Sequence, residues 1–254
     1  MGENGFGKGF RSGNLGSGGF GTGFYAPTAG IAATGLVLQY DIGNPTSYPG
    51  SGATVTDLAG NSNATLYNGP TYTSGYLTFD GSNDALITNT SLASKVTTDI
   101  TSISMWAYPM DNGVLLSEVG SAALPAAAGW HDAQMEMVAG TMKFGMWAGV
   151  GIGSITSTIA TPLNNWYHFT IVYDGTTLRA YVNGVAAGTN TFARLNPVEG
   201  GTGIHYAIAA ADFTNMGDGS YANMRLGQFL VYNTALSADQ VLQNFNATRS
   251  TYGV

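Results

Sequence analysis

Residues 166–186 read WYHFTIVYDGTTLRAYVNGVA. In an extended chain, the odd-numbered side chains of 167–173, which are Tyr, Phe, Ile and Tyr, share one face, and the even-numbered ones share the other. Asp-Gly at 174–175 supplies a turn, after which Leu178, Ala180 and Val182 alternate with polar or aromatic neighbours. Asn-Gly at 183–184 suits the positive φ angles of a tight hairpin. The stretch therefore predicts a β-meander.

The same alternation recurs on both sides of this meander. Four more short runs predict strands, and each is bounded by turn residues or proline: LVLQYD (36–41), YLTFD (76–80), SISMWAY (102–108) and MKFGMW (142–147). Many short strands separated by turns are typical of an antiparallel sandwich or barrel. We expect one domain over 35–254, because all-β folds of this length commonly form a single unit.

One segment near the C-terminus has the pattern of a helix. Ser237 can cap it, and Gln240 three residues later completes a capping box. Ala238, Val241, Leu242 and Phe245 form an apolar stripe at helical spacing. The pattern predicts a short helix over 237–248 that lies on a sheet, since a single stripe needs a surface to cover. The fold class expected is all-β, a two-sheet antiparallel sandwich with one C-terminal helix.

Composition excludes several classes of protein. The formal charge of −7 and the isoelectric point near 4.6 argue against a nucleic-acid partner, which requires clustered Lys and Arg. There is no cysteine, so neither disulfides nor thiolate-bound zinc stabilise the fold. No secretory signal pattern opens the chain, and no run is apolar enough for a membrane helix. We therefore expect a soluble protein with no membrane insertion.

Three segments resemble the concanavalin A-like lectin/glucanase superfamily, in its laminin-G-like jelly-roll branch. They are the opening strands through the FDGSND turn (79–84), the meander of 166–184, and the closing strand and helix of 224–247. The resemblance spans roughly 35–250 and implies a jelly roll of two antiparallel sheets. Proteins of tailed-phage virions contain segments similar to DIGNPTSYPGSG (41–52) and QNFNATR (243–249). The superfamily contains lectins, glycanases, adhesion modules and virion proteins, so the fold alone does not assign a function.

Patterns of catalytic residues are missing. Retaining glycanases of this fold would carry E-x-D-x-x-E on one strand, which sets two carboxylates at the required spacing. Neither Glu118, Glu136 nor Glu199 opens such a triplet. His131, His168 and His205 are dispersed, and we expect His168, inside the meander, to be a packed residue. The sequence predicts a protein that is not an enzyme; the alternative is a hydrolase that uses Asp132 with Glu136.

Two places are candidates for binding small ligands. Trp130, followed by His131 and Asp132 after a long loop, could stack on a sugar ring or could instead cover the end of the sandwich. His205-Tyr206 is a weaker candidate of the same kind. The other tryptophans, Trp106, Trp147 and Trp166, sit in strand patterns and are expected in the core.

The FDGSND turn offers a calcium alternative. Asp80 and Asp84 could bind Ca²⁺, although a strong site usually gathers more carboxylates. The reading that we favour is a tight turn in which Asp80 and Asn83 bond backbone amides. No other cofactor is expected.

The N-terminal segment, residues 1–34, differs from everything after it. One motif occurs twice, as GFGKGF (5–10) and GFGTGF (19–24), and 10 of the first 25 residues are glycine. Flexible linkers normally lack aromatic residues, so we interpret this segment, the arm, as a docking element whose backbone can lie close to a partner. The side chains that would fill pockets in the partner are Phe6, Phe10, Phe20, Phe24 and Tyr25.

Together these observations predict a non-enzymatic virion structural protein, made in the host cytoplasm. The arm would anchor it to a capsid or tail scaffold, in a homo-oligomer, and the lectin-like domain would bind host-surface glycans. The alternative is a secreted or cell-surface carbohydrate-binding module, in which the arm is only a linker.

Overall fold

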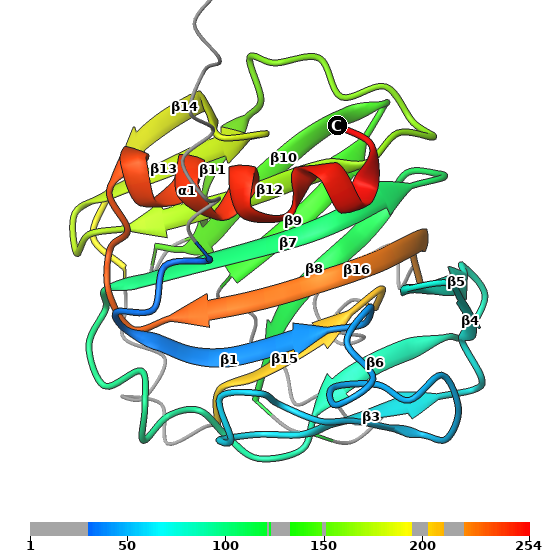
Figure 1. Cartoon of the computed structure of the whole chain (residues 1–254). Helices are drawn as coiled ribbons and strands as arrows, with labels where there is room; N and C mark the ends of the chain where they lie inside the picture. Colours follow the sequence, from blue (N-terminus) through cyan, green and yellow to red (C-terminus); the bar gives the residue numbers. More distant parts are fainter. Residues whose placement is uncertain (1–29, 121, 123–132, 149–150, 195–202, 211–220) are drawn as a thin grey trace, which may run out of the picture.

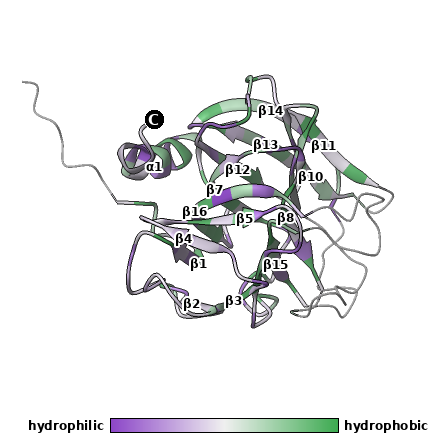
Figure 2. Ribbon diagram, turned by 90° about the vertical axis from the view of Figure 1, so that its right-hand side faces the viewer, coloured by the Kyte–Doolittle hydropathy of each residue, from purple (hydrophilic) through white to green (hydrophobic). Residues whose placement is uncertain are grey.

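The computed structural model describes residues 30–120, 122, 133–148, 151–194, 203–210 and 221–254. In these residues, two antiparallel sheets lie face to face and one helix covers the outer surface of the first sheet (Figures 1 and 2). The predicted all-β jelly-roll sandwich with a C-terminal helix is confirmed. No helix in these ranges is long and apolar enough to cross a membrane.

The first sheet has eight strands in the described residues, and its middle is formed by the longest strands of the chain. From one edge to the other its strands are β14 (Val185–Thr191), β13 (Thr177–Val182), β12 (Tyr167–Tyr173), β7 (Thr101–Pro109), β16 (Asn223–Tyr232), β5 (Tyr76–Asp80) and β4 (Thr71–Thr73), with β1 (Leu36–Asp41) also on β16. The ten residues of β16 pair with β5 as far as Leu226 and with β1 from Gln228 onward. The first and last strands therefore lie side by side.

The second sheet also has eight strands in the described part of the chain. In spatial order they are β11 (Ile152–Thr156), β10 (Thr141–Trp147), β9 (Ala133–Val138), β8 (Gly113–Val119), β15 (His205–Ile208), β6 (Ala85–Thr88), β3 (Ala64–Tyr67) and β2 (Thr54–Val55). The inner faces of the two sheets share one hydrophobic core. This core includes Met135, Met142 and Met146 of the second sheet together with the aromatic residues of β12.

The meander folds as its alternation predicts. Tyr167, Phe169, Ile171 and Tyr173 belong to the core between the sheets, and Val172 belongs to the separate cluster under the helix. Asn183 and Gly184 adopt φ angles of 52° and 77°, the left-handed pair that a two-residue hairpin requires.

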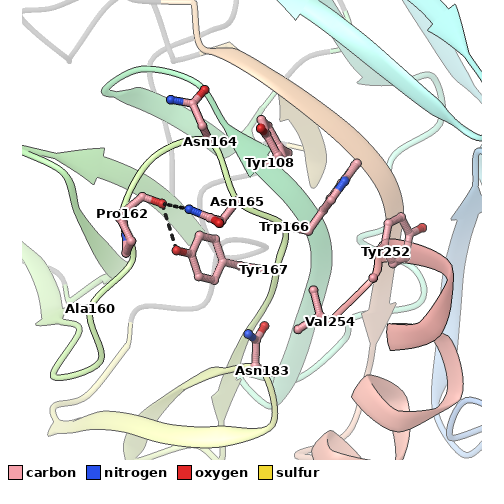
Figure 3. A pocket seen from close by; sticks show the side chains of 11 residues that line it. Tyr108, Ala160, Pro162, Asn164, Asn165, Trp166, Tyr167, Asn183, Tyr252 and Val254 are labelled. Carbon is pink, nitrogen blue, oxygen red and sulfur yellow. Dashed lines mark hydrogen bonds between the residues drawn. The ribbon is translucent and has the colours of Figure 1, made fainter.

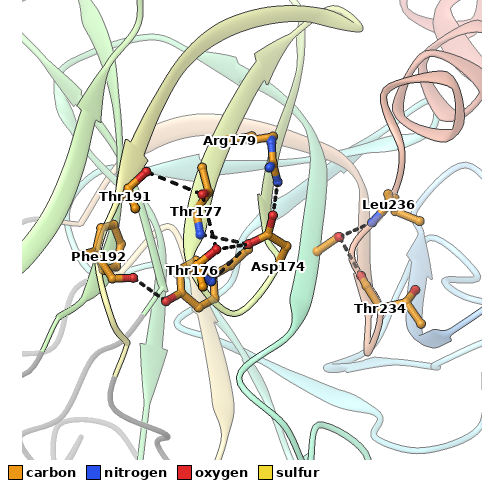
Figure 4. A network of polar contacts seen from close by, with 10 residues as sticks. Asp174, Thr176, Thr177, Arg179, Thr191, Phe192, Thr234 and Leu236 are labelled. Carbon is orange, nitrogen blue, oxygen red and sulfur yellow. Dashed lines mark hydrogen bonds and ion pairs between the residues drawn. The ribbon is translucent and has the colours of Figure 1, made fainter.

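A polar network closes the turn before β13 (Figure 4). Oδ1 of Asp174 accepts hydrogen bonds from the backbone of Thr176 and Thr177, and Oδ2 lies 2.6 Å from a guanidinium nitrogen of Arg179. The Thr177 amide and the Arg179 guanidinium lower the pKa of this carboxyl. The network therefore holds the 174–175 turn in one conformation.

The helix α1 (Ala238–Thr248) begins as predicted and continues into a 3-10 turn, η2 (Arg249–Tyr252). Ser237 and Gln240 form the full capping box. The predicted stripe is wrong in two members: Ala238 is exposed and Leu242 is 42% exposed. The polar Asn244 is buried in the contact with the sheet instead. The helix packs over Val172 and Tyr181 on the outer face of the first sheet.

The described end of the arm contacts this helix. The backbone N–H of Ala32 donates to Oδ1 of Asn244 at 2.7 Å, and Nε2 of Gln243 donates to the carbonyl of Gly30 at 2.6 Å. Ala32 is buried in the cluster under the helix. Gly30 and Ala32 therefore tie the described end of the arm to the domain.

Candidate functional site

The sugar-binding candidates from the sequence have different outcomes. Trp130, His131 and Asp132 lie outside the described residues, as do Phe6, Phe10, Phe20, Phe24 and Tyr25 of the arm. Tyr206 is fully buried and its ring packs 5.5 Å from that of Phe229. The expectation of an exposed aromatic at 206 is wrong, because β15 turns this side chain into the core.

The FDGSND turn adopts the favoured geometry at Asp80, but no bond from a backbone amide to the Asn83 side chain is found in the described residues. Oδ1 of Asp80 accepts from the backbone N–H of Ser82 at 2.7 Å and of Asn83 at 3.3 Å, and Oδ2 of Asp84 accepts from the backbone N–H of Asp80. These amides lower the pKa of Asp80. Asn83 takes part through its carbonyl, which accepts from Asn68. Within the described ranges, no three His, Asp or Glu side chains are close enough together to hold a metal ion.

Two titratable residues that could have served catalysis are instead internal. Glu118 is buried and lies 3.7 Å from the guanidinium of Arg194, which is equally buried. His168 is 0% exposed and packs against the rings of Trp106 and Phe245. Burial lowers the pKa of His168 to about 3, so it is neutral at physiological pH. His168 is a packed residue, as expected.

A cluster of aromatic rings occupies the outer face of the first sheet, beyond the end of α1. Its centre is Trp166, whose ring centroid lies 5.7 Å from that of Tyr76, 5.6 Å from Tyr108 and 4.7 Å from Tyr252. The rings come from β5, β7, η2 and the residue before β12. All four are half-buried, so this aromatic cluster is anchored on the sheet while part of it faces solvent.

A cavity of about 640 Å³ opens beside the aromatic cluster (Figure 3). Aromatic and amide side chains dominate its lining, which consists of Tyr108, Ala160, Pro162, Asn164, Asn165, Trp166, Tyr167, Asn183, Tyr252, Gly253 and Val254. Trp166 was expected in the core and is instead part of this wall. Trp106, by contrast, is fully buried as expected.

The amides of the cavity are held by bonds to the protein itself. Oδ1 of Asn183 accepts from the backbone N–H of His168 at 2.8 Å. Nδ2 of Asn165 donates to the carbonyls of Pro162 and Leu163, and the hydroxyl of Tyr167 donates to the same Pro162 carbonyl at 2.9 Å. The polar atoms that remain unused on these side chains therefore have fixed positions before any ligand arrives.

The wall formed by Tyr252 depends on a glycine. Gly227, at the irregularity in β16, leaves room for the Tyr252 ring, which a Cβ at this position would strike. The Tyr252 ring also stacks on the ring of Trp106, with 4.4 Å between the two ring centroids. Burial raises the pKa of the Tyr252 hydroxyl, so it is neutral at physiological pH.

The model of the concanavalin A-like lectin/glucanases superfamily matches residues 79–242, which is more than half of the chain. The match includes β12, Trp166 and Asn183, but it ends before η2. No curated protein matches the sequence.

Several solved structures share the fold. Trypanosoma rangeli sialidase in complex with sialic acid aligns with a TM-score of 0.64 and 15% identity, over 89% of this chain and 35% of that one. The binding domain of Paraclostridial Mosquitocidal Protein 1 aligns at 0.61 and 16%, over 84% and 52%. A structure of botulinum neurotoxin type C, which enters cells through interaction with two ganglioside molecules, aligns at 0.62 and 12%, over 84% and 51%. The chain thus spans a third to a half of these proteins, and the likeness shows the fold alone.

Proposed function

This chain belongs to the concanavalin A-like lectin/glucanases superfamily, and we propose that it binds a glycan in the cavity beside Trp166. The observation that carries the proposal is the combination of aromatic faces and fixed amides around one opening. Aromatic rings stack on the C–H faces of sugars, and amides bond their hydroxyls. Solved structures of the same fold include a sialidase with sialic acid and a ganglioside-dependent toxin, which supports a glycan as the ligand class.

A glycan array probed with the full chain tests this proposal. We expect binding to a defined set of glycans and a loss of at least about fivefold in affinity for Trp166→Ala, since one stacked ring contributes on the order of 1 kcal/mol or more. Tyr72→Ala is the matched control, because Tyr72 is a partly exposed aromatic on β4 that does not line the cavity. Absence of any glycan binding, or equal losses in both variants, would contradict the proposal.

We propose further that the protein binds without catalysis. None of the described residues that line the cavity is an aspartate, a glutamate or a histidine, whereas glycoside hydrolysis generally requires a pair of carboxylates. A reducing-sugar assay on the glycans identified by the array tests this point directly. Release of reducing ends that is lost in Glu136→Gln would favour the hydrolase alternative.

For the arm, we propose that residues 1–34 anchor the protein, as a homo-oligomer, to a capsid or tail scaffold of a phage particle. The repeated GFGKGF and GFGTGF phrases support a docking role, as does the charge contrast between an arm of +1 and a remainder of −8. Asn244 accepts a hydrogen bond from Ala32 and Gln243 donates one to Gly30, so the described end of the arm lies against α1. The domain would then display its cavity outward from the particle.

Deletion of residues 1–29 separates this proposal from a secreted carbohydrate-binding module. The deletion keeps Gly30 and Ala32, and therefore both contacts with α1. We expect the shortened chain to fold and to bind the same glycans, but to be missing from purified particles. Normal incorporation of the shortened chain would contradict anchoring by the arm. Absence of the full-length chain from particles would favour the secreted module, in which the arm is only a linker.

A further inference from the structure

We infer that the cavity beside Trp166 selects uncharged pyranoses and discriminates against carboxylated sugars such as uronic or sialic acids. The inference rests on the glycan-binding function proposed above and adds to it the chemical class of the ligand. Two independent features of the cavity carry it: the absence of a cation in the described lining, and the hydrogen-bonding atoms that Asn183, Asn165 and Tyr167 leave free.

The first feature is charge. None of the described residues that line the cavity has a lysine, arginine or histidine side chain. The cation nearest to the aromatic cluster in the described contacts is Arg225, whose guanidinium lies 4.6 Å from the ring centre of Tyr108 and 5.1 Å from that of Tyr76. Arg225 stacks on these rings and does not line the cavity. A carboxylate that entered the cavity would lose hydration without gaining an ionic partner, which is unfavourable.

The second feature begins at Asn183. Its Oδ1 is engaged by the backbone N–H of His168, which fixes the amide so that Nδ2 is the free end. No described group accepts a hydrogen bond from this Nδ2, and Figure 3 shows the Asn183 side chain rising from the hairpin toward Tyr167 and Val254. Asn183 therefore offers the cavity a donor.

Beside Pro162, two side chains of the lining offer acceptors. Nδ2 of Asn165 already donates to two carbonyls, so its Oδ1 is the end left for a ligand. The Tyr167 hydroxyl already donates its hydrogen bond to the Pro162 carbonyl, so toward a ligand it can only accept one. A sugar hydroxyl both donates and accepts, so it can satisfy Asn183 and Asn165 alike. A carboxylate only accepts, so it could pair with Asn183 but would face the oxygens of Asn165 and Tyr167 without a hydrogen bond.

Matched sugar pairs test the inference on the wild-type chain. Each pair consists of a hexose and its uronic acid, which differ only at C6: glucose and glucuronate, galactose and galacturonate, mannose and mannuronate, each presented on the same linker. For the pair that binds, we expect the hexose to bind at least about tenfold more tightly at neutral pH, as expected when buried polar groups are left without partners. Equal binding, or preference for the uronic acid with Trp166 still required, would overturn the selectivity and leave the glycan-binding function standing. If no sugar binds, both fail.

Asn183→Asp tests the donor directly. Aspartate keeps the oxygen that accepts from His168 and tolerates the left-handed backbone of an Asx-Gly hairpin, but it replaces the free donor with an acceptor. We expect about tenfold weaker hexose binding with little change in melting temperature. Asn246→Asp, on the exposed face of α1, adds the same charge away from the cavity and should bind normally. Unchanged binding in Asn183→Asp would overturn the assignment of the donor, and the wild-type pairs test the selectivity even if this variant does not fold.

Discussion

Nε1 of Trp106 donates a 2.7 Å hydrogen bond to Oγ1 of Thr248, which ties the middle of β7 to the last residue of α1. The indole is fully buried and stacks on Tyr252 at 4.4 Å and on Phe245 at 5.8 Å. The helix and the Tyr252 wall of the cavity therefore rest on the same side chain. Anything that loosens α1 should also disturb the candidate site.

Thr248→Val tests how much the hydrogen bond between Trp106 and Thr248 stabilises the protein. Valine matches the shape of threonine but cannot accept the bond, so the Trp106 N–H stays buried without a partner. We expect the free energy of unfolding to fall by about 1–3 kcal/mol, the cost of an unsatisfied buried donor. Denaturant titration measures the change. Thr248→Ser keeps the hydroxyl and should lose less; a ranking in the opposite order would contradict the role of the hydrogen bond.

Asn244→Leu tests the polar anchor under the helix. Oδ1 of Asn244 accepts from the Ala32 amide, and Nδ2 donates to the hydroxyl of Tyr232 at 3.0 Å. Leucine would leave both partners unsatisfied, and we expect a loss of roughly 2–4 kcal/mol in the free energy of unfolding. Hydrogen exchange at the Ala32 amide should accelerate at the same time.

Gln243→Ala is the control for Asn244→Leu. It removes only the bond to the Gly30 carbonyl at the surface, so its cost should stay within about 0.5 kcal/mol. Comparable losses in the two variants would mean that burial of Asn244 is not what secures the arm's end.

The fold was accessible from the sequence because its signals are local. The alternation of 167–173 and the Asn-Gly hairpin depend only on neighbouring residues, and the structure reproduces both. The capping box of α1 is local in the same sense. Asn244 shows where such reasoning ends: its partner Ala32 is 212 residues away, so no helical period could place this polar residue, in preference to Leu242, against the sheet.

The candidate site was harder to predict for a related reason. Trp166 continues the strand alternation, but it stands one residue before β12 begins, where the sheet surface is shared with η2. Its exposure depends on Tyr76, Tyr108 and Tyr252, which lie in three other elements. The usable signal was the adjacent Asn164-Asn165 pair, since a few polar side chains beside an aromatic ring are typical of a small-ligand site. Tyr206, by contrast, is buried although it was a candidate for exposure, because its strand, β15, lies inside the second sheet.

Acidification should destabilise the protein through His168. Burial lowers its pKa in the folded chain to about 3, against 6.5 for an ordinary histidine. Between these values the unfolded chain takes up a proton that the folded chain does not bind. This contribution to stability is therefore fully present above about pH 7 and is lost as the pH falls from 6.5 toward 3, by up to about 1.4 kcal/mol per pH unit.

Comparison with His168→Leu isolates this contribution, because the other titrating groups are shared by the two proteins. Unfolding titrations between pH 7 and pH 4 should show a shallower dependence in the variant. Parallel curves for the two proteins would contradict the assignment to His168.

Gly227→Ala should alter the site more than the fold. A Cβ at 227 would strike the ring of Tyr252, and that ring is packed between Trp106 and Trp166, so it has to move away from its place in the cavity wall. We expect a changed near-ultraviolet circular dichroism spectrum with an unchanged far-ultraviolet one, together with glycan binding weakened by about tenfold or more if the stacking surface is lost. Gly30→Ala is the matched control, because a Cβ there meets nothing within 4 Å. Should Gly227→Ala keep both the aromatic spectrum and the affinity, the Tyr252 ring would not be a fixed part of the wall, and the ligand would have to rely on Trp166 and the amides.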